Sequence, residues 1–100
     1  MLYDYGRSLT ILRESKSPAD PQALALAALG WVLSEETRAA RLLALTGLTP
    51  EALREGLGDP AVLGAVLDFL CAHEPDLVGA AEALGVEPAE LAGAAGRLAR

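Results

Sequence analysis

The most reactive side chains in this 100-residue sequence are its single cysteine, Cys71, and its single histidine, His73. A thiol beside an imidazole can act as a nucleophile, and both side chains are common zinc ligands. On a helix, residues two apart point to nearly opposite sides, so these two cannot share a metal ion. Asp68 could meet Cys71, but two ligands do not make a site. We therefore interpret Cys71 as a small core residue and His73 as a cation at a helix C-terminus, where the dipole favours it.

The carboxylates of the C-terminal third are the other group that could carry catalysis. They are Glu74, Asp76, Glu82, Glu87 and Glu90. Paired carboxylates perform acid–base catalysis only where a cleft shifts their pKa values. The sequence implies no such cleft, and we interpret these residues as a solvated face. The sequence thus predicts no catalytic residue and no metal ligand. We therefore expect a protein that is not an enzyme.

The glycines do not predict a cofactor site either. Gly93 and Gly96 lie within a helical pattern with no strand before it, which fits neither a phosphate-binding loop nor a dinucleotide-binding motif. They are better explained as sites of close helix contact. No residue is predicted to bind a cofactor, and no small-molecule ligand is expected.

The composition favours a single all-helical domain. Apolar residues make up 52% of the chain and are mostly Ala and Leu, whereas the β-branched residues of strands are few. The start of the sequence lacks the pattern of a signal peptide, and the longest apolar run, residues 23–33, is too short to span a bilayer. A single cysteine excludes an intramolecular disulfide. We therefore expect a cytoplasmic protein that does not enter a membrane.

The prolines indicate where the helices begin. Five of the six follow an acidic residue or a threonine, side chains that favour a helix N-terminus, and proline itself suits the first helical position. The predicted helices are 21–33, 35–46, 50–57, 60–73, 75–84 and 88–99. Ser34 could cap the second helix, but the periodicity leaves open whether the first two are continuous. We expect Gly47, Gly58 and Gly85 to end helices in the left-handed conformation.

The apolar periodicity assigns faces to these helices. The segment 60–73 is apolar nearly all round, which is typical of a central helix. The expected inward rows are Leu24, Ala28 and Trp31 with Leu26, Leu29 and Leu33 beside them, and, in the next helix, Ala39, Leu42 and Leu43. Arg38 and Arg41 are expected to face solvent with Glu36. The prediction is an all-α, compact bundle of five or six short helices around helix 60–73.

Residues 1–19 do not share this pattern, and we predict an N-terminal arm outside a helical domain of residues 20–100. The sequence leaves open whether this arm is flexible or packs on the bundle or on a partner. The formal net charge is −6. The arm has three basic and two acidic residues, a net charge of +1, and the remainder has five basic and twelve acidic residues, a net charge of −7. An acidic body repels nucleic-acid phosphates.

Two segments, 44–53 ("ALTGLTPEAL") and 82–91 ("EALGVEPAEL"), place glycine and proline at the same positions. Both predict a helix, a glycine turn with an inward apolar residue, Leu48 or Val86, and a second helix. A DNA-reading helix-turn-helix has the same turn, but its second helix needs exposed basic or amide side chains. Helix 50–57 offers only Arg54, between two glutamates. We therefore interpret both segments as packing corners.

The sequence also resembles a known family. The matching features are "ALALAALGWVL" with Trp31, then "LLALTGL", and then "VLDFL" followed by acidic residues and a last helical segment. They are similar to a bacterial family, best known from alphaproteobacteria, catalogued as a domain of unknown function, number three-five-seven-two. The resemblance covers about residues 22–98. It implies a cytoplasmic all-α protein and carries over no functional residue.

These observations predict a small non-enzymatic helical module that binds another protein or forms a homodimer. The mean hydropathy of +0.30 is high for so short a chain, so the bundle leaves apolar surface for a partner. The alternative is a transcription-associated DNA-binding protein that uses a helix-turn-helix corner.

Overall fold

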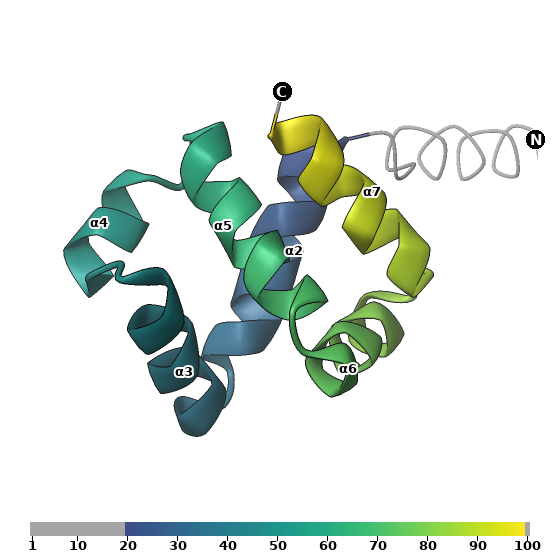
Figure 1. The fold of residues 1–100 in the computed structure, drawn as a ribbon, viewed down its shortest axis with the longest axis horizontal. Helices are drawn as coiled ribbons and strands as arrows, with labels where there is room; N and C mark the ends of the chain where they lie inside the picture. The colour runs from purple at the N-terminus through teal and green to yellow at the C-terminus, as the bar shows by residue number, and fades with distance from the viewer. Residues whose placement is uncertain (1–19, 100) are drawn as a thin grey trace, which may run out of the picture.

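The computed structural model describes residues 20–99, which form six helices and no strand (Figure 1). The helices are α2 (Pro21–Leu33), α3 (Glu36–Thr46), α4 (Pro50–Glu55), α5 (Pro60–Cys71), α6 (Glu74–Leu84) and α7 (Pro88–Leu98). The all-α prediction is confirmed for these residues. The predicted arm, residues 1–19, lies outside the described part of the chain.

Side-chain caps explain why three helices begin at their prolines. Asp20, Thr49 and Asp59 each accept a hydrogen bond from a backbone N–H of the first turn, at 3.1, 3.0 and 2.9 Å. In each case proline follows at the start of the helix. The cap satisfies a donor that has no partner within the helix, so the predicted starts of α2, α4 and α5 are confirmed.

The first two helices are separate, which settles the alternative that the periodicity left open. Ser34 lies after the end of α2, where its hydroxyl donates to the Trp31 carbonyl at 2.6 Å. The cap of α3 is Glu35, whose carboxylate accepts from the Arg38 backbone N–H at 3.1 Å. The interpretation of Ser34 as the cap was wrong, because its hydroxyl is used at the end of α2.

Two of the three predicted left-handed glycines are confirmed, Gly47 with φ 76° and Gly85 with φ 72°. The prediction for Gly58 was wrong, because α4 ends earlier, at Glu55 with Gly56 as its C-cap, and Gly58 does not have a positive φ. Gly56 is buried, and a Cβ there would lie 2.6 Å from a methyl carbon of Val62. A glycine is needed at this position for the close approach of α5 and not for a left-handed turn.

The two glycine corners share a shape but use different hydrogen bonds. After Gly47, the backbone N–H of Leu48 donates to the Thr46 hydroxyl at 3.3 Å. After Gly85, the N–H of Val86 donates to the Ala81 carbonyl at 3.0 Å, and Leu84 occupies the position that Thr46 has in the first corner. Leu48 and Val86 both pack against the core as predicted.

The core lies around two crossed helices, α2 and α5, each of which contacts α3, α6 and α7 as well as the other. The predicted central position of α5 is confirmed, and α2 shares it (Figure 1). Leu63, Val66, Leu67 and Leu70 of α5 are fully buried. α5 ends at Cys71, earlier than predicted, because the chain turns there into α6. Among residues 20–99, no helix is long and apolar enough to cross a bilayer.

The faces of α2 differ from the prediction. The buried residues are Ala25, Ala28, Leu29 and Val32. Leu26 and Leu33, which were expected to form an inward row with Leu29, are 41% and 47% exposed. The helix has no charged residue between Pro21 and Leu33, so its sequence could not show which side faces the core.

Candidate functional site

An ion pair between α3 and α6 is the centre of the candidate site. The Arg41 guanidinium donates to the Asp76 carboxylate, 35 residues away in sequence. Asp76 is only 8% exposed and is the one buried charged side chain among the described residues. The prediction that Asp76 lies on a solvated face was wrong, whereas Arg41, which was expected in solvent, keeps 38% of its side chain exposed while it pairs with Asp76. A carboxylate loses its hydration when buried, so it needs a cation beside it, and α3 supplies Arg41.

His73 joins the same cluster. Its Nδ1 lies 3.1 Å from the Asp76 carboxylate oxygen that binds Arg41. The predicted role of His73 at a helix C-terminus was wrong, because α5 has already ended at Cys71 and His73 is the residue that precedes α6. α6 therefore begins at Glu74 and not at Pro75. We call Arg41, His73 and Asp76 the polar cluster.

A second arginine, Arg38, was also expected in solvent but lies half-buried against Trp31. Its guanidinium carbon is 3.7 Å from the centroid of the indole ring. Its Nη2 donates to the Trp31 carbonyl at 2.7 Å and to the Ser34 hydroxyl at 3.0 Å. On α6, a Cβ at Gly79 would lie 2.9 Å from the indole ring. The ring therefore packs on Arg38 and on the backbone of Gly79, which holds α2, α3 and α6 together.

Cys71 is exposed, so its interpretation as a core residue was wrong. Partial burial raises the pKa of the Cys71 thiol, and the negative charge of Asp68 raises this pKa further. Asp68 acts on the thiol as their spacing of three residues suggested. A raised pKa reduces the thiolate fraction, which is the reverse of what an activated nucleophile needs. Among residues 20–99, no three His, Cys, Asp or Glu side chains are grouped to hold a metal ion.

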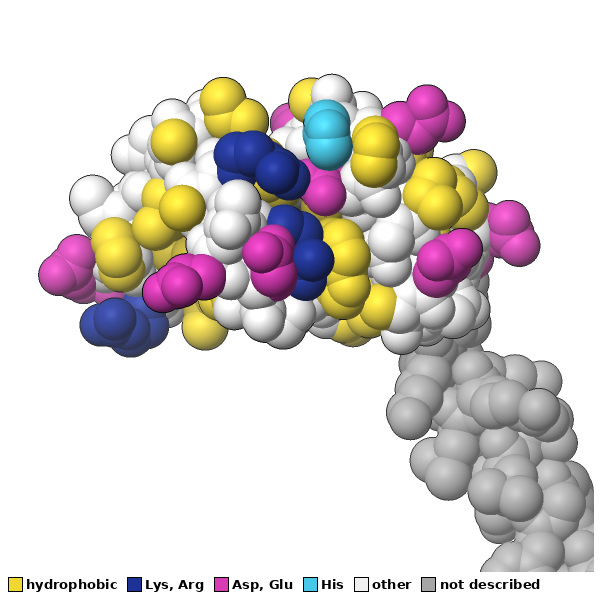
Figure 2. Space-filling view, turned by 90° about the horizontal axis from the view of Figure 1, so that it is seen from below, with side chains coloured by type: hydrophobic (Ala, Val, Ile, Leu, Met, Phe, Trp, Pro, Cys, Tyr) yellow, Lys and Arg dark blue, Asp and Glu magenta, His cyan; other side chains and the backbone are white. Residues whose placement is uncertain are grey.

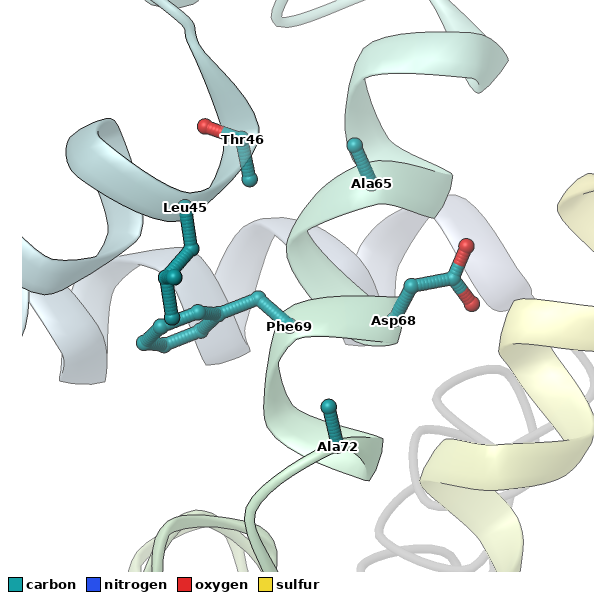
Figure 3. Close-up of a pocket in the computed structure, with 6 residues that line it drawn as sticks. All are labelled: Leu45, Thr46, Ala65, Asp68, Phe69 and Ala72. Carbon is teal, nitrogen blue, oxygen red and sulfur yellow. The ribbon is translucent and has the colours of Figure 1, made fainter.

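An open hollow of about 410 Å³ lies between α3 and α5. Its lining residues are Leu45, Thr46, Ala65, Asp68, Phe69 and Ala72 (Figure 3). The Leu45 and Phe69 side chains point toward one another from the two helices, whereas the Asp68 carboxylate points away from α3. Leu45 is 72% exposed, the highest value among the large apolar residues described. We call this surface the α3–α5 hollow.

The hollow contains few polar groups that a ligand could use. The Thr46 hydroxyl already donates to the Leu42 carbonyl at 2.6 Å and accepts from the Leu48 N–H. Asp68 also lines the hollow, and its carboxylate lies at the edge, directed away from α3. At the Phe69 ring the hollow adjoins the polar cluster, because the Arg41 guanidinium lies 5.8 Å from the ring centroid. This chemistry suits an apolar side chain with a nearby cation.

Figure 2 shows one face of the molecule on which arginine, acidic and histidine side chains gather beside apolar ones. Apart from the residue types themselves, no sequence pattern indicated this grouping. Its members come from α2, α3 and α6, so only the packing of these helices brings them together. The arrangement provides a charged and an apolar surface next to each other.

The described residues thus define a small all-α domain. The family model described as "Protein of unknown function (DUF3572)" matches residues 18–100, and the chain belongs to this family. The resemblance noted in the sequence is confirmed, over a slightly longer segment. Comparison with curated proteins and with solved structures gave no match.

Proposed function

We propose that this protein is a non-enzymatic helical module that binds another protein through the α3–α5 hollow. The observation that carries the proposal is the exposure of Leu45, 72%, directly beside the Phe69 ring. An exposed large apolar side chain at the edge of an apolar hollow is typical of a protein-binding site. The proposal places this binding in the cytoplasm, which the single cysteine supports.

The residues that line the hollow indicate which kind of segment a partner would place there. Its length along α5, from Ala65 to Ala72, is two helical turns, which suits a short amphipathic helix with one or two large apolar side chains. The Asp68 carboxylate favours a lysine or arginine beside those side chains. The net charge of −6 favours the approach of such a basic segment.

Matched variants test this function. Leu45→Asp places a charge in the hollow, whereas Leu57→Asp places one at another leucine, which is 40% exposed and does not line the hollow. We select the proteins that the unmodified chain and Leu57→Asp capture from the native cell but Leu45→Asp does not. Calorimetry then measures the affinity of each of these proteins for the three chains. We expect Leu45→Asp to weaken binding at least about tenfold.

The partner's charge provides a second readout. Asp68→Asn should reduce the affinity by roughly twofold to fivefold and reduce its dependence on salt. A captured protein that binds Leu45→Asp as tightly as the unmodified chain contradicts the proposal. Light scattering at micromolar concentration tests the homodimer version, which a strictly monomeric chain would remove.

A further inference from the structure

We infer that the segment that occupies the α3–α5 hollow also carries a carboxylate, which Arg41 binds one helical turn away from the apolar contact at Leu45. This inference rests on the function proposed for the hollow and specifies the partner further. It adds an acidic side chain, as a second determinant of specificity, to the apolar and basic side chains described above.

Arg41 lies at one end of the hollow. Leu45 lines the hollow from α3, and Arg41 lies one turn earlier in the same helix. The Arg41 guanidinium is 5.8 Å from the centroid of the Phe69 ring, which lines the hollow from α5. The Leu45 side chain points toward this same ring (Figure 3). An occupant that packs on Leu45 therefore comes close to a cation.

The Arg41 guanidinium has hydrogen-bond donors to offer to this occupant. A guanidinium has five N–H donors, and within residues 20–99 that of Arg41 donates only through Nη2, to Asp76. Its side chain is 38% exposed. The one buried side-chain nitrogen without a partner in this part of the chain is Nε of Arg38, so the remaining Arg41 donors are in contact with solvent. They can bind a second carboxylate.

The Asp76 contact orients Arg41 without using all of its charge. Asp76 is buried and belongs to another helix, so the guanidinium is held in place before a partner binds, which reduces the entropy lost on binding. The Asp76 carboxylate is shared with His73, whose Nδ1 lies 3.1 Å away. Arg41 is therefore left with charge for an incoming carboxylate, and a charge-assisted hydrogen bond is the strongest contact that it can make.

Two other arginines lack this combination of features. The Arg38 guanidinium covers the Trp31 ring and donates to the Trp31 carbonyl and the Ser34 hydroxyl. Arg54 is exposed on α4, and it does not line the hollow. Arg41 is therefore the arginine that recognises the occupant, and Arg54 provides a control.

The spacing along α3 defines the spacing in the partner. Leu45 and Arg41 are four residues apart, and side chains at this spacing lie about 5–6 Å apart on one face of a helix. A partner helix that lies along α3 matches this distance when its large apolar side chain and its carboxylate are also about four residues apart. A carboxylate two residues from the apolar side chain points to the other side of the helix and misses Arg41.

Peptide titrations test this inference on the full chain. The probes are four helical peptides of alanine and glutamine that contain one leucine. A glutamate stands four residues after the leucine, four residues before it or two residues after it, and in the fourth peptide glutamine replaces it. We expect one of the first two peptides to bind at least about threefold more tightly than the other three. The NMR shifts of the Leu45 and Phe69 amides measure the binding.

Variants of the chain assign the preference for glutamate to Arg41. The preference should disappear in Arg41→Met/Asp76→Leu, which removes the cation together with the carboxylate that it compensates. It should persist in part in Arg41→Lys, which keeps the charge but not the planar group, and should be unchanged in Arg54→Ala. Circular dichroism of each variant checks that the helical bundle is intact.

The outcomes separate this inference from the function on which it rests. If all four peptides bind equally and Leu45→Asp abolishes their binding, the carboxylate contact is excluded and the hollow remains a binding site. A preference for glutamate that Arg41→Met/Asp76→Leu retains also excludes the contact. Shifts that are absent with every peptide, or that Leu45→Asp leaves unchanged, would overturn the inference together with the proposed use of the hollow.

Discussion

The Arg41–Asp76 pair joins α3 and α6 through a single side-chain contact. Asp76 is buried and receives the guanidinium of Arg41 from another helix. Arg41→Ala leaves this carboxylate with His73 alone, and we expect it to lower the free energy of unfolding by about 2 kcal/mol, since Arg41 is itself partly exposed. Urea unfolding measures the change.

Two further variants test whether the loss of stability in Arg41→Ala comes from the buried carboxylate of Asp76. Arg54→Ala removes an exposed arginine of α4 and should change the free energy of unfolding by no more than about 0.5 kcal/mol. Arg41→Met/Asp76→Leu removes both charges together and should recover part of the loss. If the double variant were less stable than Arg41→Ala, the loss would not come from an uncompensated carboxylate.

The thiol of Cys71 gives a prediction about reactivity. Its pKa is raised by partial burial and by Asp68, so the thiolate fraction at pH 8 is lower than in a free cysteine. Because the folded state holds this proton more tightly, any stability linked to the thiol is present below the ordinary cysteine pKa and is lost as the pH rises through the raised value.

Removing the nearby charge should therefore increase the reactivity of Cys71. Asp68→Asn should raise the rate of alkylation by iodoacetamide at pH 8 roughly twofold to threefold. Glu82→Gln, on another helix, should leave the rate unchanged. A slower reaction in Asp68→Asn would contradict the cause assigned to the shift.

The sequence could not place these residues because their partners are distant. Periodicity put Arg38 and Arg41 on the polar side of their helix, which is where they are. It could not show that Trp31 of the preceding helix and Asp76 of α6 lie against that side. Exposure of a long side chain depends on the neighbouring elements as well as on its own helix.

At the scale of the helices, starts were predicted better than ends. An acidic residue or threonine before proline specifies a start through a local hydrogen bond, as at Asp20, Thr49 and Asp59. An end depends on what the chain meets next. Gly56 ends α4 against Val62, and α5 ends at Cys71 because the chain turns into α6.

Gly79 shows how a single position determines the packing of two helices. A Cβ there would lie 2.9 Å from the Trp31 ring, which Arg38 covers on another side. We expect Gly79→Ala to lower the free energy of unfolding by about 1–3 kcal/mol because the ring must move. Thermal unfolding followed by Trp31 fluorescence measures both the stability and the displacement.

The matched control for this substitution is Gly93→Ala. Gly93 also lies inside a helix, and a Cβ there would meet no atom within 4 Å. Alanine favours the helix over glycine, so this variant should be more stable by up to about 1 kcal/mol. Equal effects of the two substitutions would show that the Trp31 contact does not limit the space at Gly79.

At the scale of the whole molecule, the sequence predicted the helical fold and the central position of α5 but not that α2 shares this central position. Both helices are rich in apolar residues, and each can be buried on any side. Only tertiary packing decides that α5 is enclosed on more of its surface and that Leu26 and Leu33 of α2 remain exposed. The binding site proposed above therefore depends on the assembled bundle.

The net charge of the molecule gives a last prediction, which distinguishes protein binding from DNA binding. The second helix of the first glycine corner, α4, is six residues long and exposes Arg54 with Glu51 and Glu55. Glutamates on both sides of the arginine repel phosphates, so duplex DNA should not be retarded in a gel shift even at low salt. Glu51→Lys/Glu55→Lys reverses these charges and should give weak, sequence-independent binding that moderate salt abolishes. Retardation by the unmodified chain, lost in Arg54→Ala, would favour the helix-turn-helix alternative, because only a specific contact at the corner could overcome the repulsion of an acidic body.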